Sequence, residues 1–203
     1  MRFMRSLFAV PVLVSALFAA DTYKIDPAHS SANFSVRHML ISNVPGRFSD
    51  VSGAIVYDEQ DVTKSSVEAV VKTASVNTDN ANRDRDLRSP NFFDVEKYPE
   101  MTFKSQRVEK RGDQLVAIGT LTIKDVSKQV ELPFELSKAK TPMGIAIGVS
   151  ASIKINRQDY GVAYNRLMEG GGAVVGNDVK IDLNVEARPA QPPPASPKPA
   201  EKK

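Results

Sequence analysis

Alternating apolar and polar residues dominate the middle of the chain. The clearest case is the segment 179–187, in which apolar side chains occupy every second position and charged or amide side chains lie between them. The apolar members are Val179, Ile181, Leu183 and Val185. Because successive side chains of a β-strand point to opposite faces, this period of two predicts a half-buried strand.

The same alternation or a suitable composition recurs along the chain. It predicts further strands at 31–37, 46–57, 66–76, 101–109, 115–123, 130–137 and 145–155. Turn-forming residues at Gly112–Asp113, Asp125 and Pro142–Gly144 separate neighbours in this series. About eight strands joined by short turns, with no helix repeated between them, predict an all-β antiparallel sandwich or barrel. An eight-stranded barrel is favoured because closure removes the exposed edges of a large sheet.

One segment, Asp79–Pro99, interrupts the alternation and predicts a short helical insertion around residues 79–97. Asp79 or Asn80 is suited to cap its first helix, and Asp84 and Arg88 have the i,i+4 spacing of an ion pair.

Ser89 followed by Pro90 predicts the start of a second helical turn in this insertion, which Pro99 ends. The apolar residues of the insertion are Leu87, Phe92, Phe93 and Val95. These side chains need a surface to cover, so we expect the insertion to lie over an open end of the barrel.

The two ends of the chain differ from its middle. Residues 1–20 have the form of a cleavable signal peptide, with Arg2 and Arg5 before the apolar run 7–18 and small residues near Ala20. The run is too short to span a bilayer, so export without a transmembrane segment is expected. Residues 188–203 are rich in Pro, Ala and Lys and predict a disordered tail.

The positive charge of the chain belongs to these ends. The whole sequence carries a net charge of +3, but residues 21–187 contain 21 basic and 23 acidic residues and carry −2. The domain is therefore slightly acidic, and the arginines of 83–88 alternate with aspartates. Nucleic acid is not an expected partner.

Few side chains are available for catalysis or metal binding. The chain has no Cys and 2 His, His29 and His38, which excludes thiolate nucleophiles, thiolate zinc sites and disulfides. Asp26, His29 and Ser30 or Ser31 supply the residue types of a catalytic triad, but the motif that normally presents the serine is absent. We expect no enzyme activity, no bound metal and no cofactor.

The predicted inward residues leave the state of the interior open. Large residues such as Phe103 and Phe134 occur together with small ones such as Ala117 and Ala151. An eight-stranded barrel either fills its interior with side chains or encloses one small ligand, and the alternation fits both arrangements equally.

Three longer stretches resemble the YceI-like family of exported, lipocalin-like proteins. They are DTYKIDPAHSSANFSVRHMLISNVPGRF, NANRDRDLRSPNFFDVEKYPEMTF and GTLTIKDVSKQVELPFEL, and the similarity covers residues 21–187. His29 and His38 match the two early histidines of the family, and 83–99 matches its middle motif. The resemblance implies a periplasmic, lipocalin-like barrel that holds a polyisoprenoid or another long-chain amphiphile and has no established catalytic activity.

This resemblance favours a lipid-filled cavity and suggests its residues. The predicted contacts of the apolar tail are Phe34, Val36, Phe48, Leu87, Phe92, Phe103, Leu121 and Phe134. The predicted contacts of the head group at the mouth are His38, Asn82, Arg83 and Arg88. The expected partner is an isoprenoid, quinone-like or fatty lipid, and these features also allow a homodimer. The alternative is a structural or stress-related interaction protein with a filled barrel and no lipid ligand.

Overall fold

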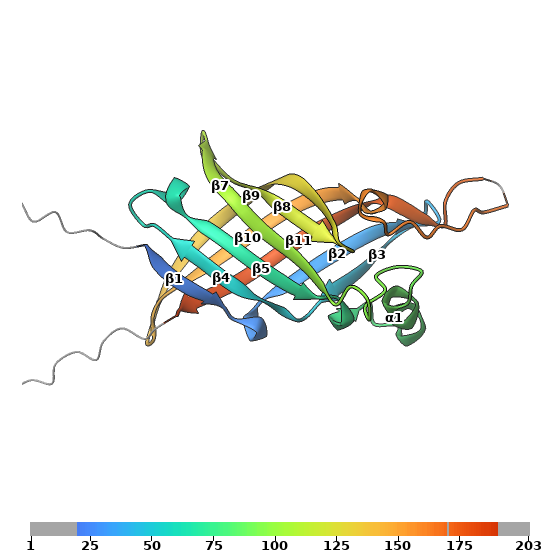
Figure 1. Ribbon diagram of the computed structural model, residues 1–203, viewed down its shortest axis with the longest axis horizontal. Coiled ribbons are helices and arrows are strands. Elements are labelled where there is room, and N and C mark those ends of the chain that lie inside the picture. The colour runs from blue at the N-terminus through green and yellow to red at the C-terminus, as the bar shows by residue number, and fades with distance from the viewer. Residues whose placement is uncertain (1–19, 170, 191–203) are drawn as a thin grey trace, which may run out of the picture.

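One antiparallel β-sheet that closes on itself forms the body of the protein in the computed structural model (Figure 1). The structure describes residues 20–169 and 171–190. The strands are β1 (Asp21–Ile25), β2 (Ser31–His38), β3 (Ser42–Phe48), β4 (Val51–Tyr57), β5 (Ser66–Lys72), β6 (Val76–Asn77), β7 (Glu100–Arg111), β8 (Gln114–Ile123), β9 (Val126–Thr141), β10 (Gly144–Asn156) and β11 (Val175–Pro189). The helix is α1 (Ala81–Arg88), and the 3-10 helices are η1 (Pro27–His29), η2 (Val62–Lys64), η3 (Thr73–Ser75) and η4 (Arg157–Tyr160).

The closed ring contains eight strands in the order β1-β4-β5-β7-β8-β9-β10-β11, and β11 returns to pair with β1. Ile25 lies opposite Ala187 at this closure, and every neighbouring pair in the ring is antiparallel. The predicted eight-stranded antiparallel barrel is therefore confirmed. Closure gives both edges of every ring strand a hydrogen-bonding partner along part of its length.

The structure divides two of the predicted strands and adds one strand that the sequence did not predict. The segment 46–57, predicted as one strand, is divided at Ser49–Asp50 between β3 and β4. The segment 66–76, also predicted as one strand, is divided by η3 into β5 and β6. β1 was not predicted, and η1 separates it from β2. β11 pairs with β1 near its end and with β2 before that, so β2, β3 and β6 extend the wall beyond the ring.

The alternation along the chain determines which side chains face inward. In β11 the alternate residues Val179, Ile181, Leu183 and Val185 all face the barrel interior. In β9 the same holds for Val130, Leu132, Phe134 and Leu136. The intervening polar residues face outward, as a period of two requires in a strand with one buried face.

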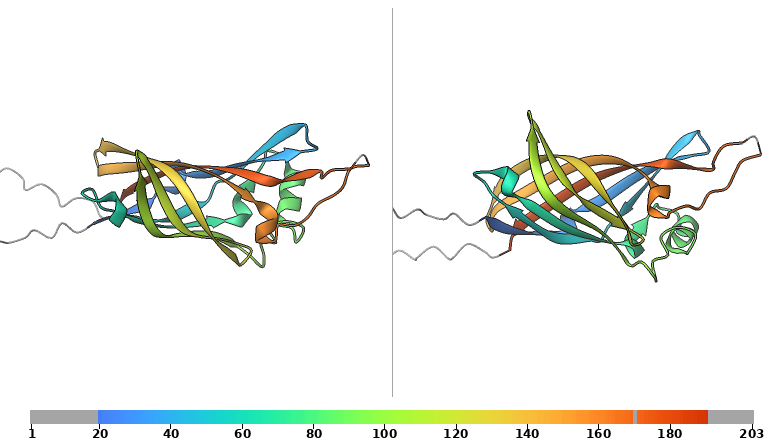
Figure 2. Two further views of the ribbon diagram at one scale, coloured as in Figure 1. Left: turned by 90° about the horizontal axis from the view of Figure 1, so that it is seen from above. Right: turned by 45° about the horizontal axis from the view of Figure 1, so that its top comes forward.

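Helix α1 lies at one end of the barrel, together with the β2–β3 turn and the loop between η4 and β11 (Figures 1 and 2). Asn80 caps α1 by accepting a hydrogen bond from the backbone N–H of Arg83 at 3.0 Å. Ser89 ends α1, and residues 90–97 form hydrogen-bonded turns. The predicted second helical turn is therefore wrong, because Asp94 adopts a left-handed conformation with φ of 50°.

The predicted signal peptide lies outside the described residues except for Ala20, and the predicted tail does so after Ala190. β11 continues to Pro189, which pairs with Tyr23, so the barrel extends two residues past the expected boundary at Ala187. Within residues 20–169 and 171–190, no helix has both the length and the apolar character needed to cross a membrane.

Candidate functional site: an apolar cavity inside the barrel

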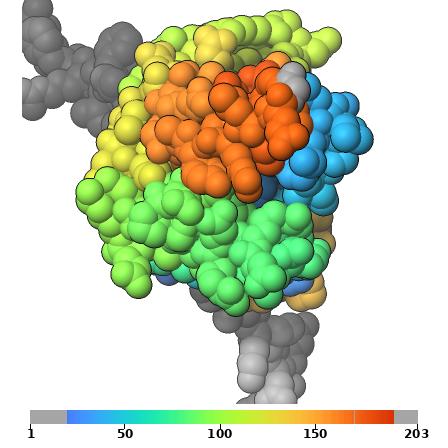
Figure 3. All heavy atoms as spheres, turned by 90° about the vertical axis from the view of Figure 1, so that its right-hand side faces the viewer, coloured from blue at the N-terminus to red at the C-terminus, as the bar shows by residue number. Residues whose placement is uncertain are grey.

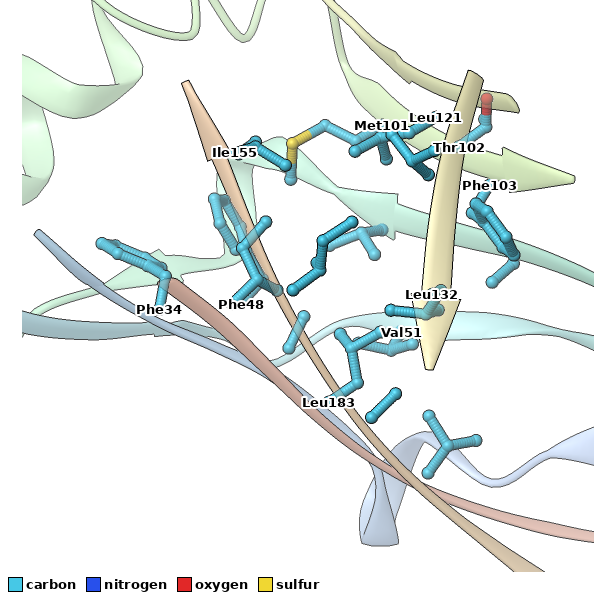
Figure 4. A pocket seen from close by; sticks show the side chains of 18 of the residues that line it. Phe34, Phe48, Val51, Met101, Thr102, Phe103, Leu121, Leu132, Ile155 and Leu183 are labelled. Atoms are coloured by element: carbon cyan, nitrogen blue, oxygen red, sulfur yellow. The ribbon is translucent and has the colours of Figure 1, made fainter. Parts of the chain in front are cut away.

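The barrel encloses a cavity of about 270 Å³. Every strand of the ring contributes lining side chains, and carbon atoms form nearly all of the cavity surface (Figure 4). Polar side chains in the lining direct their polar atoms elsewhere: Ser65 accepts a hydrogen bond from the backbone of Asp58, and Asn33 donates one to Ser31. The cavity therefore offers a hydrocarbon environment with almost no hydrogen-bonding capacity.

All eight residues predicted from the sequence to contact an apolar tail line this cavity. They are Phe34, Val36, Phe48, Leu87, Phe92, Phe103, Leu121 and Phe134. The small residues Ala117 and Ala151 also line it, and their short side chains leave room between the large ones. The barrel thus retains a cavity, while the contact of these residues with a ligand stays a prediction.

Aromatic rings gather at the α1 end of the cavity. The ring of Phe48 lies 5.5 Å from that of Phe34 and 5.3 Å from that of Phe93, measured between centroids. Phe92 lies 5.1 Å from Tyr164, which belongs to the loop between η4 and β11. These contacts join the barrel wall, the segment after α1 and this loop into one cover (Figure 3).

Arg157 is a residue of this end that the sequence analysis missed. Only 5% of its surface is exposed, and its guanidinium donates hydrogen bonds to the backbone carbonyls of Val162, Tyr164, Val175 and Gly176. No carboxylate in the described chain forms an ion pair with it, and burial lowers the pKa of its guanidinium. Arg157 therefore holds the loop between η4 and β11, and the start of β11, against the barrel by hydrogen bonds to their carbonyls.

The alternation in β10 contained a signal for Arg157. Inward residues Val149, Ala151, Ile153 and Ile155 recur with a period of two, and Arg157 takes the next inward position just after the strand. A lone arginine at the end of an inward series indicates a buried cation bonded to backbone.

None of the four predicted head-group residues lines the cavity. Arg83 donates to the hydroxyl and carbonyl oxygens of Thr78, at 2.7 and 2.8 Å. Arg88 donates to the carbonyls of Ala74 and Val76. Both guanidinium groups therefore fasten α1 to the segment around β6, and their contact with a head group stays a prediction.

His38 and Asn82 lie near the same end without sharing one site. His38 ends β2, where its backbone pairs with Ser42 and Val175. Asn82 is exposed on α1 and accepts a hydrogen bond from Arg85 at 3.4 Å.

The predicted ion pair between Asp84 and Arg88 is wrong. The buried carboxylate of Asp84 instead accepts hydrogen bonds from the backbone N–H and the hydroxyl of Thr78, at 2.8 and 2.6 Å. A buried carboxylate needs such donors close by, and the Thr78 turn supplies them.

A second polar cluster lies where β1 passes into β2. Asp26, His29 and Glu186 place one potential metal-ligand atom each within 4.8 Å of one another. Arg188 reaches both carboxylates, at 3.2 Å from Asp26 and 3.0 Å from Glu186. Arg188 therefore forms ion pairs with both carboxylates, and His29 bonds to Asp26, so the cluster is an ion-pair network that joins this junction to β11.

The same cluster shows how the suggested triad is arranged. Asp26 bonds to His29 at 3.0 Å, but the hydroxyl of Ser30 exchanges hydrogen bonds with the backbone of Glu186. Ser31 accepts a hydrogen bond from Asn33. Neither serine is hydrogen-bonded to His29 in the described chain, so no nucleophile–base pair forms there.

Comparison with known proteins places this barrel in a family. The model of the YceI-like domain family matches residues 23–187. The chain belongs to the YceI-like family. A UPF0312 protein of Photorhabdus laumondii is 39% identical over 159 residues, which cover 76% of this chain and 83% of that protein.

Solved structures share the YceI-like fold. The crystal structure of the Campylobacter jejuni YCEI protein is 35% identical, covers 76% of this chain and 90% of that chain, and superposes with a TM-score of 0.65. A structure described as a polyisoprenoid binding domain from Saccharophagus degradans is 17% identical, covers 82% of this chain and 98% of that chain, and has a TM-score of 0.63. The second similarity establishes the fold alone.

Proposed function

We propose that this protein is an exported binding protein that holds a polyisoprenoid or another long-chain amphiphile in its barrel, as a carrier, store or scavenger. The observation that carries the proposal is the carbon-lined cavity of about 270 Å³. The description of the Saccharophagus degradans domain as polyisoprenoid-binding supports the same ligand class on the same fold.

The physical basis is the transfer of hydrocarbon out of water. Each buried CH₂ group contributes about 0.8 kcal/mol of gross transfer free energy, before the costs of association. Because the lining forms almost no hydrogen bonds, affinity depends on the shape and length of the chain rather than on directional contacts. The polar head group of such a ligand belongs outside the carbon-lined part, where water or polar side chains can solvate it.

The role in export rests on residues 1–20, whose pattern is that of a signal peptide. A periplasmic location fits a barrel that keeps an apolar chain out of water between two membranes. Cell fractionation with mass determination of the mature N-terminus tests this part, and a periplasmic protein beginning near Asp21 is the expected result.

Native mass spectrometry of protein purified from its source tests the ligand. We expect an adduct that organic solvent extracts and that chromatography identifies as a prenyl or fatty lipid. Ala151→Phe places a ring inside the cavity and should reduce bound lipid at least tenfold. Ser152→Phe is the matched control, because Ser152 neighbours Ala151 but is exposed on the outer face.

Two results would contradict the proposal. One is a native protein that carries no lipid and binds no added prenyl alcohol or fatty acid, which would favour the structural or stress-related interaction role. The other is equal lipid content in the Ala151→Phe and Ser152→Phe proteins, since a ligand outside the barrel would be insensitive to the filling of its interior.

A further inference from the structure

Large hydrophobic side chains are exposed at the α1 end of the barrel. Leu40 and Ile41, on the β2–β3 turn, are 64% and 79% exposed, and Leu167, on the loop between η4 and β11, is 75% exposed. Met39 is exposed on the same turn. We call these four residues the apolar tip. Exposed aliphatic side chains this large on adjoining turns mark a surface that meets another apolar phase.

The two turns that carry the apolar tip are bonded together. The backbone N–H of Met39 donates to the carbonyl of Val174 at 2.8 Å, next to the pairing of His38 with Val175. The side chain of Leu40 also reaches the loop, since a Cβ added to Gly172 would lie 3.5 Å from its Cδ1 atom. The tip is therefore one continuous feature built from distant parts of the sequence.

The backbone of each turn is held in place. Met39 and Leu40 adopt left-handed conformations, with φ of 50° and 61°, and the guanidinium of Arg37 donates to the carbonyl of Leu40 at 2.9 Å. Leu167 pairs with Ala173 across the loop. Non-glycine residues with positive φ require support, and here that support fixes the outward direction of aliphatic side chains.

Two arginines adjoin the tip: Arg37 bonds to the carbonyl of Leu40, and Arg166 precedes Leu167. Arg37 and Arg166 flank it, and Glu169 is the acidic residue of the same two turns, so the tip region has a net charge of +1 with His38 neutral. The domain as a whole, residues 21–187, carries −2. Apolar side chains next to arginines suit the surface of a lipid leaflet, because arginine can reach phosphates while aliphatic groups enter the acyl boundary.

The tip also adjoins the cover of the cavity. Tyr164, three residues before Leu167, contacts Phe92 of the cavity lining. Figure 3 shows the β2–β3 turn, the loop after η4 and the segment around α1 meeting over this end, with a recess between them. Strand β1 and the end of β11 that pairs with it lie at the opposite end (Figure 1).

We propose that the apolar tip docks this protein on the surface of an anionic phospholipid bilayer. Leu40, Ile41 and Leu167 enter the headgroup and acyl boundary, and Arg37 and Arg166 face the lipid phosphates. Docking in this orientation brings the covered end of the cavity against the leaflet. An apolar ligand then passes between bilayer and barrel over a short distance instead of through water.

Vesicle flotation tests the docking with protein recovered from its host, its N-terminus determined by mass spectrometry. The vesicles are phosphatidylethanolamine with phosphatidylglycerol at a ratio of about 3:1, and phosphatidylcholine alone for comparison. Leu40→Ser with Ile41→Ser and Leu167→Ser should reduce binding to the anionic vesicles at least tenfold. Arg166→Glu should reduce it severalfold and weaken its dependence on salt.

Met143→Ser with Ile145→Ser is the matched control. Both residues are exposed, by 55% and 42%, but they lie at the β9–β10 turn, at the end of the barrel where Ile147 pairs with Ala187. All variants share the same chain ends, so a difference between them reports on the tip. The control should bind vesicles as the native protein does.

Three results would overturn the proposal. The native protein could bind neither kind of vesicle, or the tip variant could bind as well as the control. In a third result, sedimentation velocity would show a native dimer that the tip variant dissociates, without vesicle binding, and the tip would then be an interface between copies.

Detergent-delivered prenyl alcohol separates this proposal from that of lipid binding. The tip variant should still take up the delivered ligand while failing to exchange it with vesicles. A tip variant that loses vesicle docking but still takes up the ligand thus tests the docking proposal alone. A native protein that fails to take up the ligand contradicts the proposed lipid binding in the cavity and leaves the docking proposal to the vesicle experiment.

Discussion

Phe34 and Gly46 lie opposite each other on strands β2 and β3, and the ring of Phe34 covers the glycine. A Cβ atom added to Gly46 would lie 2.3 Å from Cζ of this ring. Because Gly46 has no side chain, the ring of Phe34 can occupy the space next to it. Because Phe34 also contacts Phe48, the glycine positions both rings at the α1 end of the cavity.

Gly46→Ala should destabilise the protein by about 1–3 kcal/mol, because the new methyl group displaces the ring of Phe34. In a Phe34→Ala background the same substitution should cost much less, since the ring is absent. Urea unfolding of the four proteins of this double-mutant cycle measures the coupling. Equal costs in both backgrounds would show that the ring and the glycine are independent.

Arg157→Met should destabilise the protein by about 2 kcal/mol, because four buried or part-buried carbonyls lose a charged donor. Amide hydrogen exchange should also accelerate in the cover loop around Val162 and Tyr164, as measured by mass spectrometry. Arg166→Met, an exposed change in the same loop, should alter stability by less than about 0.5 kcal/mol. Similar stability for the two variants would exclude the anchoring role of Arg157.

Arg88→Ala should lower the free energy of unfolding by about 1–2 kcal/mol, because the hydrogen bonds to Ala74 and Val76 are lost. Its affinity for a prenyl phosphate should stay within about twofold of native. Arg85→Ala, on the exposed side of the same helix, is the control and should be nearly neutral.

The opposite pattern would support the head-group prediction for Arg88. In that case Arg88→Ala would keep its stability and bind prenyl phosphate at least tenfold more weakly, while binding prenyl alcohol normally. Urea unfolding and a fluorescent prenyl probe give the two measurements on the same samples.

Asp26 makes the protein sensitive to acid. Hydrogen bonds from His29 and from the backbone of Ala28, with the charge of Arg188, hold the pKa of its carboxyl below the ordinary value of 3.8. A depressed pKa in the folded state contributes stability that is present above the unfolded value and lost as the pH falls through the folded value. Protonation of Asp26 therefore weakens the fold below a pH of about 4.

Asp26→Asn retains an oxygen that can cap η1 but removes the charge. The native protein should have the higher melting temperature at neutral pH, and the difference should shrink as the pH falls through the lowered pKa of the carboxyl. Thermal unfolding over this pH range checks the trend. A difference that stays constant with pH would assign the effect to shape rather than charge.

Period-two alternation predicted an antiparallel sandwich or barrel and the inward faces of its strands, whereas the family resemblance suggested the cavity and its contacts in the insertion, Leu87 and Phe92. Alternation is a direct consequence of strand geometry, so it alone assigns the apolar residues of β9 and β11 to the interior. The breaks at Ser49–Asp50 and at η3 could not be assigned in this way. Each depends on how a strand bends to meet two neighbours, which is a property of the closed sheet rather than of the local sequence.

The head-group role of Arg83 and Arg88 stays a prediction, but both side chains already have partners within the fold. Cations near a mouth can bind an anionic head group. In the fold, Arg83 donates to the hydroxyl and carbonyl of Thr78, and Arg88 donates to the carbonyls of Ala74 and Val76.

The inward position of Arg157 follows from the alternation of β10, but the identity of its carbonyl partners does not. A sequence shows which charged side chains could pair with one another. It does not show which backbone carbonyls a loop leaves without a hydrogen-bond partner.

The pairing of β1 with β11 has a consequence for how the protein folds. The contacts that close the ring, such as Ile25 with Ala187, join residues from opposite ends of the domain. Contacts over such long sequence separations slow folding, because the chain loses its loop entropy before it gains the closing interactions. A chain that emerges N-terminus first therefore remains an open sheet until its last strand is free, and its apolar lining is exposed during that interval.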